Sequence, residues 1–415
     1  MMRHALTLLA GAGLLCACRT EFVTGRFIEA SSASATSTSN DETTSSTTTG
    51  WSASGTEGED TSGSEVDGLN STSSGSSSST SGTTTGSGED TFIDTTGTPT
   101  CEAPSGHTVC DFGGGLFEAI GLGCNGNEDD STPVYGRELV SVDPDAVRLA
   151  QRYGNSSSFV PTEGGKFVVL SNGNLPMPGP DGRISIDLGV PGMPGPGNGN
   201  PDGTLPPGVS AAPGSEGAPF ENCDGVGDCS NSLDTALQAA PSDLVYLRFT
   251  VDVPAGTFGY KVDLAWFSAE FPSKVGQQSD LFVWWQSSEM FTGNVAHMSD
   301  GSAMSATSLA STIVDYGFVG NSGALEGTGF NGVLPFECSV PGGTYSSCPR
   351  GGATGWMQLN APVVDGESVT MTVALFDVGG ADIDTTVLLD NWLWDCDGCT
   401  LGEDCGVRSF EELER

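Results

Sequence analysis

Basic residues are scarce in this chain of 415 residues: 14 Lys and Arg stand against 53 Asp and Glu, for a formal net charge of −39. Such a surface repels phosphate backbones, so the composition excludes nucleic acid as a partner. An anionic membrane would repel it too, so membrane attachment requires a covalent or inserted anchor. The chain has only 3 histidines, so it offers few candidates for a metal or acid–base site that uses imidazole.

Long apolar runs are also missing, with one short exception near the N-terminus. Residues 5–15 are apolar, but this stretch is too short to cross about 30 Å of hydrocarbon as a helix. We therefore interpret residues 1–17 as an export signal. The signal ends in Leu-Cys-Ala-Cys, which resembles a bacterial lipobox and implies that Cys18 is lipidated. Ordinary cleavage that leaves Cys18 for a disulfide is the alternative.

The lipoprotein resemblance also implies a location. Arg19 follows the lipidated cysteine, where an Asp would favour retention at the inner membrane. We therefore expect an outer-membrane or cell-surface lipoprotein of the cell envelope, held to the membrane through its lipid anchor only. Residues 18–100 are rich in Ser, Thr, Gly and acids with few large apolar side chains. This composition predicts a disordered tether that carries a folded domain away from its anchor.

From residue 101 onward the pattern becomes that of a folded β domain. Apolar and polar residues alternate with period two over residues 245–253, 260–266, 281–285, 369–375 and 387–393, and more briefly over 166–170. This predicts half-buried strands in an antiparallel, jelly-roll-like β-sandwich over 101–415. The Pro- and Gly-rich residues 172–222 predict a long surface insertion within it. A single helix is expected over residues 143–153.

The 12 cysteines indicate an oxidising compartment. Loss of the signal and lipidation of Cys18 leave an even number, which favours disulfides. Short loops flanked by Gly and Pro favour two pairs, Cys223–Cys229 and Cys338–Cys348. Cys396 and Cys399 form a C-x-x-C sequence, which we interpret as structural because no βαβ pattern surrounds it.

Two patterns could support a hydrolase. Gly-Asn-Ser-Gly around Ser322 resembles the nucleophile turn of chymotrypsin-like peptidases, but a serine nucleophile needs a histidine base. His107 and His297 are the only candidates outside the export signal, and neither has a convincing context. A carboxylate-dependent hydrolase through Glu270 and Asp280 is the other version.

Carboxylates at strand ends suggest a cation instead. Glu270 follows one predicted strand and Asp280 precedes the next, while further acids, Asp390 among them, crowd the last two strands. Calcium requires six to eight oxygen ligands. We therefore predict that Glu270, Asp280 and Asp390 are gathered in space as a calcium site. Ordinary turn and hydrogen-bonding roles for these residues are the alternative.

Three stretches, residues 166–172, 243–286 and 355–395, resemble the choice-of-anchor L family of bacterial surface proteins. The matching motifs are Phe-Ser-Ala-Glu-Phe-Pro at 267–272, Ser-Asp-Leu-Phe at 279–282 and Asp-Thr-Thr-Val-Leu-Leu-Asp-Asn at 384–391. Ser279 stands where the family has Asn. The resemblance implies a surface-exposed, adhesive protein with no established enzyme activity.

We therefore expect a binding or adhesion protein that is not an enzyme. Its partner would be an extracellular glycan or a surface protein, with calcium as a candidate cofactor. Tryptophans on the domain surface, Trp284 or Trp285 among them, could stack on a sugar. A secreted hydrolase and a purely structural envelope lipoprotein are the alternatives. The sequence does not identify the residues that bind the partner.

Overall fold

The structure is a computed structural model that describes residue 101 and residues 109–111, 114–123, 133–186, 203–277, 279–311, 319–320, 322–340, 343–379 and 383–413. The predicted export signal, Cys18 and the tether lie outside the described residues. The described part is built from antiparallel sheets with a few single-turn helices. The predicted all-β sandwich with disulfides is therefore confirmed.

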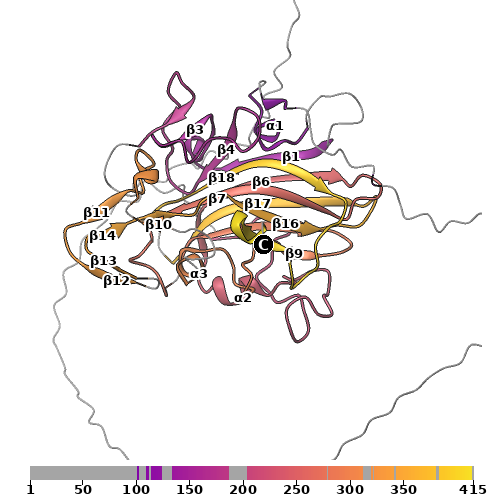
Figure 1. Cartoon of the computed structure of the whole chain (residues 1–415). Coiled ribbons are helices and arrows are strands. Elements are labelled where there is room, and N and C mark those ends of the chain that lie inside the picture. The colour runs from indigo at the N-terminus through magenta and orange to yellow at the C-terminus, as the bar shows by residue number, and fades with distance from the viewer. Residues whose placement is uncertain are drawn as a thin grey trace, which may run out of the picture. The chain divides into compact units, whose positions relative to one another are not determined.

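Two antiparallel sheets form the sandwich (Figure 1). Sheet A has the strand order β1-β6-β17-β8-β9. Its strands are β1 (Val134–Ser141), β6 (Pro241–Asp252), β17 (Ser368–Val378), β8 (Leu281–Ser287) and β9 (Thr292–Asn294). Each predicted strand of this sheet coincides with one of these elements, and only Val253 lies beyond the end of its strand.

Sheet B has the strand order β10-β15-β7-β18-β4-β2, and β16 joins it by pairing with β7 and β19. Its strands are β10 (Val319–Gly320), β15 (Gly352–Ala353), β7 (Gly259–Ser268), β18 (Thr385–Asp395), β4 (Phe167–Ser171), β2 (Val147–Ala150), β16 (Met357–Pro362) and β19 (Gly406–Ser409). Smaller pairs are β3 (Arg152–Tyr153) with β5 (Arg183–Ile184), β11 (Gly332–Leu334) with β14 (Cys348–Arg350), and β12 (Cys338–Val340) with β13 (Gly343–Tyr345).

The helical elements are short. They are α1 (Leu116–Ile120), η2 (Pro144–Ala146), α2 (Ser232–Ala236), α3 (Ala306–Ser311), η3 (Gly323–Leu325) and α5 (Phe410–Leu413). None of the helices among the described residues is long and apolar enough to cross a membrane.

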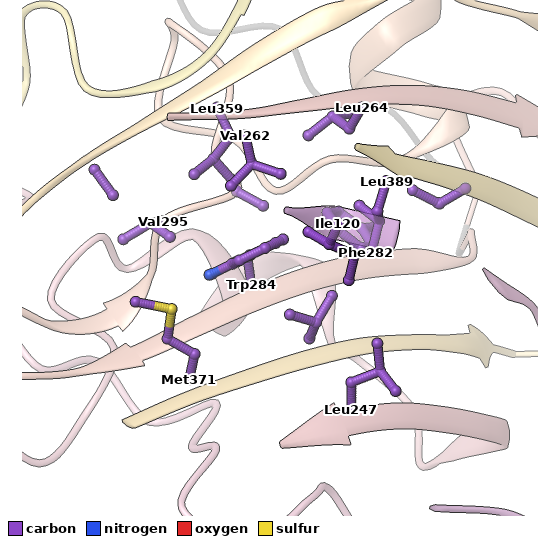
Figure 2. Close-up of a cluster of buried hydrophobic side chains, with 14 of the residues drawn as sticks. Ile120, Leu247, Val262, Leu264, Phe282, Trp284, Val295, Leu359, Met371 and Leu389 are labelled. Atoms are coloured by element: carbon purple, nitrogen blue, oxygen red, sulfur yellow. The ribbon is translucent and has the colours of Figure 1, made fainter. Parts of the chain in front are cut away.

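The main hydrophobic core lies between the two sheets. Figure 2 shows side chains from both sheets meeting there around Trp284. Val262, Leu264, Leu359 and Leu389 come from sheet B, and Leu247, Phe282 and Met371 come from sheet A. These residues follow the period-two pattern of the sequence, so one phase of each long strand faces its partner sheet.

The other phase of these strands is also buried, which the sequence pattern did not predict. A second core covers the outer face of sheet B and includes Phe267 and Leu388, and a third covers the outer face of sheet A and includes Trp285 and Phe376. Consequently all residues from Leu281 to Gln286 in β8 are buried. The prediction of half-buried strands was wrong here because loop segments cover both outer faces.

Part of that cover comes from the segment predicted as a surface insertion. Leu175, Ile184 and Ile186 pack in the core outside sheet B, and Val209 packs in the core outside sheet A. Figure 1 shows β3 on one side of the long strands and α2 on the other. The Pro- and Gly-rich segment therefore contributes to the folded unit, although residues 187–202 lie outside the described residues.

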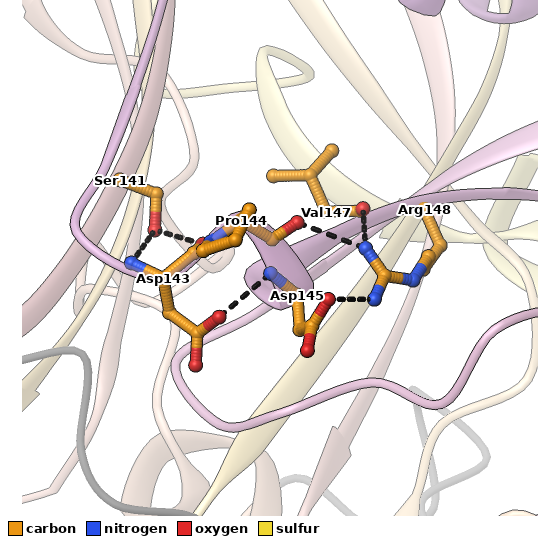
Figure 3. A network of polar contacts seen from close by, with 6 residues as sticks. All are labelled: Ser141, Asp143, Pro144, Asp145, Val147 and Arg148. Carbon is orange, nitrogen blue, oxygen red and sulfur yellow. Dashed lines mark hydrogen bonds and ion pairs between the residues drawn. The ribbon is translucent and has the colours of Figure 1, made fainter. Parts of the chain in front are cut away.

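The helix predicted over residues 143–153 is absent. Only η2 forms there, with Pro144 at its start and Asp143 capping the backbone N–H of Asp145 at 2.7 Å (Figure 3). The chain then becomes β2, because Val147 to Ala150 pair with β4. Arg148 closes the turn by donating to Asp145 and to the carbonyl of Pro144. Strand pairing overrode the local helical spacing.

Four disulfides join described cysteines. The two predicted pairs, Cys223–Cys229 and Cys338–Cys348, are both present. The cysteines of the C-x-x-C sequence do not pair with each other, since Cys396 bonds to Cys101 and Cys399 bonds to Cys405. Their role is structural, as the sequence predicted.

Candidate functional site

At one end of the sandwich, the inward phase of several strands changes from apolar to polar. In β17, the inward series from Val369 to Leu375 continues to Asp377, and the residue two before inward Phe282 of β8 is Asp280. Sheet B contributes Asn172, which directly follows β4, and Glu270, which lies two residues beyond the end of β7. Period-two geometry therefore directs all four side chains into the space between the sheets.

Asp280 and Asp377 face each other across neighbouring strands. The register that pairs Phe376 with Leu281 places Asp377 opposite Asp280. Asn172 joins the pair from sheet B, because its Nδ2 donates to Asp280 Oδ2 at 2.9 Å and to Asp377 Oδ1. The backbone N–H of Thr385 donates to Asn172 Oδ1 at 2.6 Å. This bond fixes the amide so that its NH₂ group must face the carboxylates.

A third aspartate reaches the same place through a β-bulge. Between the pairs Val245–Leu375 and Ser242–Asp377, β6 contains one residue more than β17. Asp243 lies in this bulge with a left-handed φ of 50° and is 2% exposed. It hydrogen-bonds to Asp377, which also hydrogen-bonds to Asp280. We call Asp243, Asp280 and Asp377 the aspartate triad.

Glu270 lies next to the triad. Its Oε2 accepts from the backbone N–H of Asp280 at 2.9 Å and from the hydroxyl of Ser279. Ser279 in turn accepts from the backbone N–H of Ala306 at 3.2 Å, at the start of α3. These contacts connect the interior acids with the surface around α3.

Burial dominates the electrostatics of this cluster. Removal from water, followed by the neighbouring charge of Asp280, raises the pKa of Glu270 to about 8. Burial followed by the proximity of Asp280 raises the pKa of Asp377, and burial raises the pKa of Asp280 as well. Among the described residues, no Lys or Arg forms an ion pair with Asp280 or Asp377.

The structure brings together two of the three predicted calcium ligands and places the third elsewhere. Asp390 pairs with Asp263 across β18 and β7, five residues along β7 from Ser268, near which Glu270 lies. At about 3.4 Å per residue this is roughly 17 Å along the strand. Asp390 alternates out of phase with the inward residue Leu389, so it faces the outer side of sheet B. The predicted grouping of Glu270, Asp280 and Asp390 is therefore not formed.

In the arrangement shown, no three His, Cys, Asp or Glu side chains within the described ranges are set as the ligands of a metal ion. The sequence interpretation noted that acids crowd the last strands, but it missed Asp243 and Asn172. The inward phase of β4 would have identified Asn172, because it lies two residues from the inward residue Leu170.

Directly outside the cluster lies a groove with a volume of about 460 Å³, whose accessible lining is more apolar than polar. It is bounded by the end of α2, the loop before β8, the turn at Asp300 and helix α3. Its lining residues include many with hydroxyl or amide side chains, such as Gln238, Gln277 and Thr307, and the carboxylate of Asp300. Ser279 also lines the groove, so one residue contacts both the groove and Glu270.

The predicted serine hydrolase residues do not meet. Ser322 caps η3, where its Oγ accepts from the N–H of Ala324 at 3.2 Å. His297 is 3% exposed, and burial lowers its pKa. Its carbonyl accepts from Val407 in β19, whereas Ser322 follows β10. These strands connect to β7 near residues 262 and 267, about 17 Å apart along the strand. His107 lies outside the described residues.

The positions of Glu270 and Asp280 also argue against a carboxylate-dependent hydrolase. Glu270 is 4% exposed and Asp280 is 0% exposed. They are also joined by a direct hydrogen bond from the Asp280 backbone to the Glu270 carboxylate. Paired acids in glycosidases stand about 5 to 9.5 Å apart around a sugar. These two leave no room for one.

The tryptophans of the domain pack inside the molecule. Trp284 and Trp285 do lie on opposite faces of β8, but each enters a hydrophobic core and neither exceeds 1% exposure. Trp266, Trp392 and Trp394 are buried as well, and Trp356 packs against the core outside sheet B. Trp356 is the one partly exposed tryptophan among the described residues, and it does not line the groove beside α2 and α3 described above.

No protein-family model and no curated protein matches the chain. Among solved structures, the carbohydrate-binding module TmCBM61 in complex with β-1,4-galactotriose matches 63% of this chain and 88% of its own, with 10% identity and a TM-score of 0.21. A likeness at this level carries no argument. The resemblance to the choice-of-anchor L family stays a prediction from the sequence motifs.

Proposed function

We propose that this chain is a cell-surface lipoprotein that binds an extracellular glycan in the groove beside α2 and α3. The groove is the observation that carries the proposal. Sugars offer many hydroxyl groups, which amides, hydroxyls and carboxylates can bind as donors or acceptors. Gln238 and Gln277 supply amides and Asp300 supplies a carboxylate from exposed positions, and Thr307 supplies a hydroxyl.

The remaining features fit a displayed binding module better than a hydrolase. The serine and histidine candidates are far apart, and the acids beneath the groove are buried. Disulfides among the described cysteines suit an oxidising compartment. Without a stacking aromatic, one site would bind weakly. Many lipid-anchored copies on one surface would raise the apparent affinity through multivalency.

The proposal is tested with the full chain carrying Cys18→Ser, which should appear in the soluble fraction if Cys18 bears the lipid. This protein is applied to a glycan array, and the affinity for the best glycan is measured by calorimetry. Gln277→Ala and Asp300→Ala should each weaken binding about tenfold, the effect of losing about 1.4 kcal/mol of hydrogen bonding.

Gln151→Ala is the matched control, because Gln151 is an exposed glutamine that follows β2 on sheet B, away from the groove. Its affinity should equal that of the unsubstituted chain. Binding to no glycan, or equal affinity in both groove variants, would overturn the proposal. Mass spectrometry of the glycan after incubation should show no cleavage, and a shortened product would instead indicate a hydrolase.

A further inference from the structure

The three side chains of the aspartate triad share a small interior volume. In the part of the chain that the structure describes, no Lys or Arg forms an ion pair with Asp280 or Asp377. The exposed fractions of Asp243, Asp280 and Asp377 are 2%, 0% and 2%. They come from neighbouring strands of sheet A, in the order β6, β17 and β8. Like charges directly opposite each other on neighbouring strands are destabilising, so this arrangement needs a compensating group.

The hydrogen bonds of the triad do not supply full compensation. Asn172 offers one NH₂ group to two carboxylates, and its own orientation is fixed by the Thr385 backbone. The Thr385 hydroxyl contacts both Asp280 and Ser268 Oγ, so it is also shared. Asp280 Oδ1 is buried and has no hydrogen-bond partner. A buried acceptor without a donor costs about 1–3 kcal/mol, and more when it is charged. This oxygen therefore indicates that something beyond the protein's own donors completes the site.

We propose that the aspartate triad of Asp243, Asp280 and Asp377 binds one calcium ion between the two sheets. Carboxylate oxygens are hard ligands that calcium accepts in irregular numbers and geometries. Magnesium demands a near-ideal octahedron and keeps several waters, which suits a closed interior site poorly. The carboxyl groups now touch one another through hydrogen bonds. Calcium would replace those contacts and neutralise most of the triad's charge.

This site differs from the one expected from the sequence. Asp280 is common to both, Asp243 and Asp377 replace Asp390, and Glu270 takes a supporting position through its bond to the Asp280 backbone. The inference does not depend on what the groove binds, because every ligand oxygen lies between the sheets.

The experiment uses the full chain with Cys18→Ser, stripped of metal with EGTA. Calcium is titrated by calorimetry in the presence of millimolar magnesium, which competes for loose binding by the acidic surface. One calcium per chain should bind, and saturating calcium should raise Tm by roughly 5 °C or more over EGTA. No saturable binding together with an unchanged Tm would overturn the proposal.

Asp377→Asn tests the ligand set, and Asp390→Asn is the control because Asp390 is a buried aspartate of the other sheet. Asp377→Asn should weaken calcium binding at least tenfold and shrink the Tm difference, whereas Asp390→Asn should keep both. Equal calcium binding in Asp377→Asn and the unsubstituted chain would assign the ion elsewhere and overturn the proposal. If Asp377→Asn does not fold, Asp243→Asn takes its place.

Discussion

The sandwich contains two pairs of aspartates that face each other across neighbouring strands, and the two pairs are built differently. Asp280 and Asp377 face the inside of the sandwich, whereas Asp263 and Asp390 face the outer side of sheet B. The inner pair, Asp280 and Asp377, lies next to a β-bulge in β6, and the outer pair, Asp263 and Asp390, lies next to one in β18. The register between β8 and β17 is regular, so the inner pair follows from period two, and the bulge in β6 brings Asp243 beside it.

The difference lies in the hydrogen-bond donors. Asp390 accepts from the backbone N–H groups of Thr162 at 2.6 Å, Glu163 at 3.2 Å and Asn391 at 2.9 Å. Its neighbour Asp263 accepts from the amide of Asn391 at 2.8 Å and from Gln358 at 3.2 Å. Asp280 and Asp377 share the amide of Asn172. The outer pair thus accepts several hydrogen bonds from protein donors, whereas the inner pair has fewer donors and is the one for which we propose a cation.

The largest difference in stability between the two pairs should come from removing the carboxylate of Asp390. Asp390→Ala removes the acceptor of three backbone N–H groups and should lower the free energy of unfolding by about 2–4 kcal/mol. Urea denaturation followed by tryptophan fluorescence measures this value. An effect below about 1 kcal/mol would show that water replaces the carboxylate at no cost, and would remove the contrast.

A pH dependence specific to Asp390 should be the next largest effect. Burial raises the pKa of Asp390 to about 7 despite the three N–H donors. Because this pKa lies above that of the unfolded chain, the contribution to stability is complete below about pH 4 and is lost as the pH rises through 7. The unsubstituted chain should therefore lose about 2 kcal/mol more between pH 5 and pH 7 than Asp390→Asn does.

Both chains are measured in EGTA, so that the aspartate triad is free of metal. Asp263 lies opposite, and burial raises its pKa as well, but it is present in both chains and cancels in the difference. Parallel stability curves for the two chains would mean that Asp390 does not change its proton between these pH values.

Period-two alternation is the reason why the sequence predicted the strands around the main core and part of the aspartate triad. Period two identifies which residues share a face, and the inward series in β8 and β17 leads directly to Asp280 and Asp377. The same rule excludes Asp390 from that group, because it is out of phase with Leu389. Its grouping with Glu270 and Asp280 used only closeness to strand ends and ignored this phase.

The two cores that cover the outer faces of the sheets could not be predicted in this way. Tyr153 from the short strand β3 and Phe159 and Phe330 from loops cover sheet B, and no local period marks such residues. Asp243 was missed for a similar reason. Its place in the triad depends on the bulge in β6, which exists only after β6 has paired with β17. Register and loop cover are properties of the assembled sheets.

The smallest effect is the most discriminating, because it should have opposite signs at the two pairs. In EGTA, Asp280→Asn keeps an oxygen for Asn172 and replaces the unpartnered oxygen with an NH₂ group that can donate to Asp377. We expect the free energy of unfolding to stay equal or to rise by about 1 kcal/mol. Asp390→Asn should lower the free energy of unfolding by a similar amount, since an NH₂ group would then face backbone N–H donors.

In saturating calcium, Asp280→Asn should become less stable than the unsubstituted chain. Urea denaturation of the three chains with EGTA and with calcium measures all of these values. A loss of stability in Asp280→Asn of equal size under both conditions would mean that Asp280 serves the fold in the same way as Asp390.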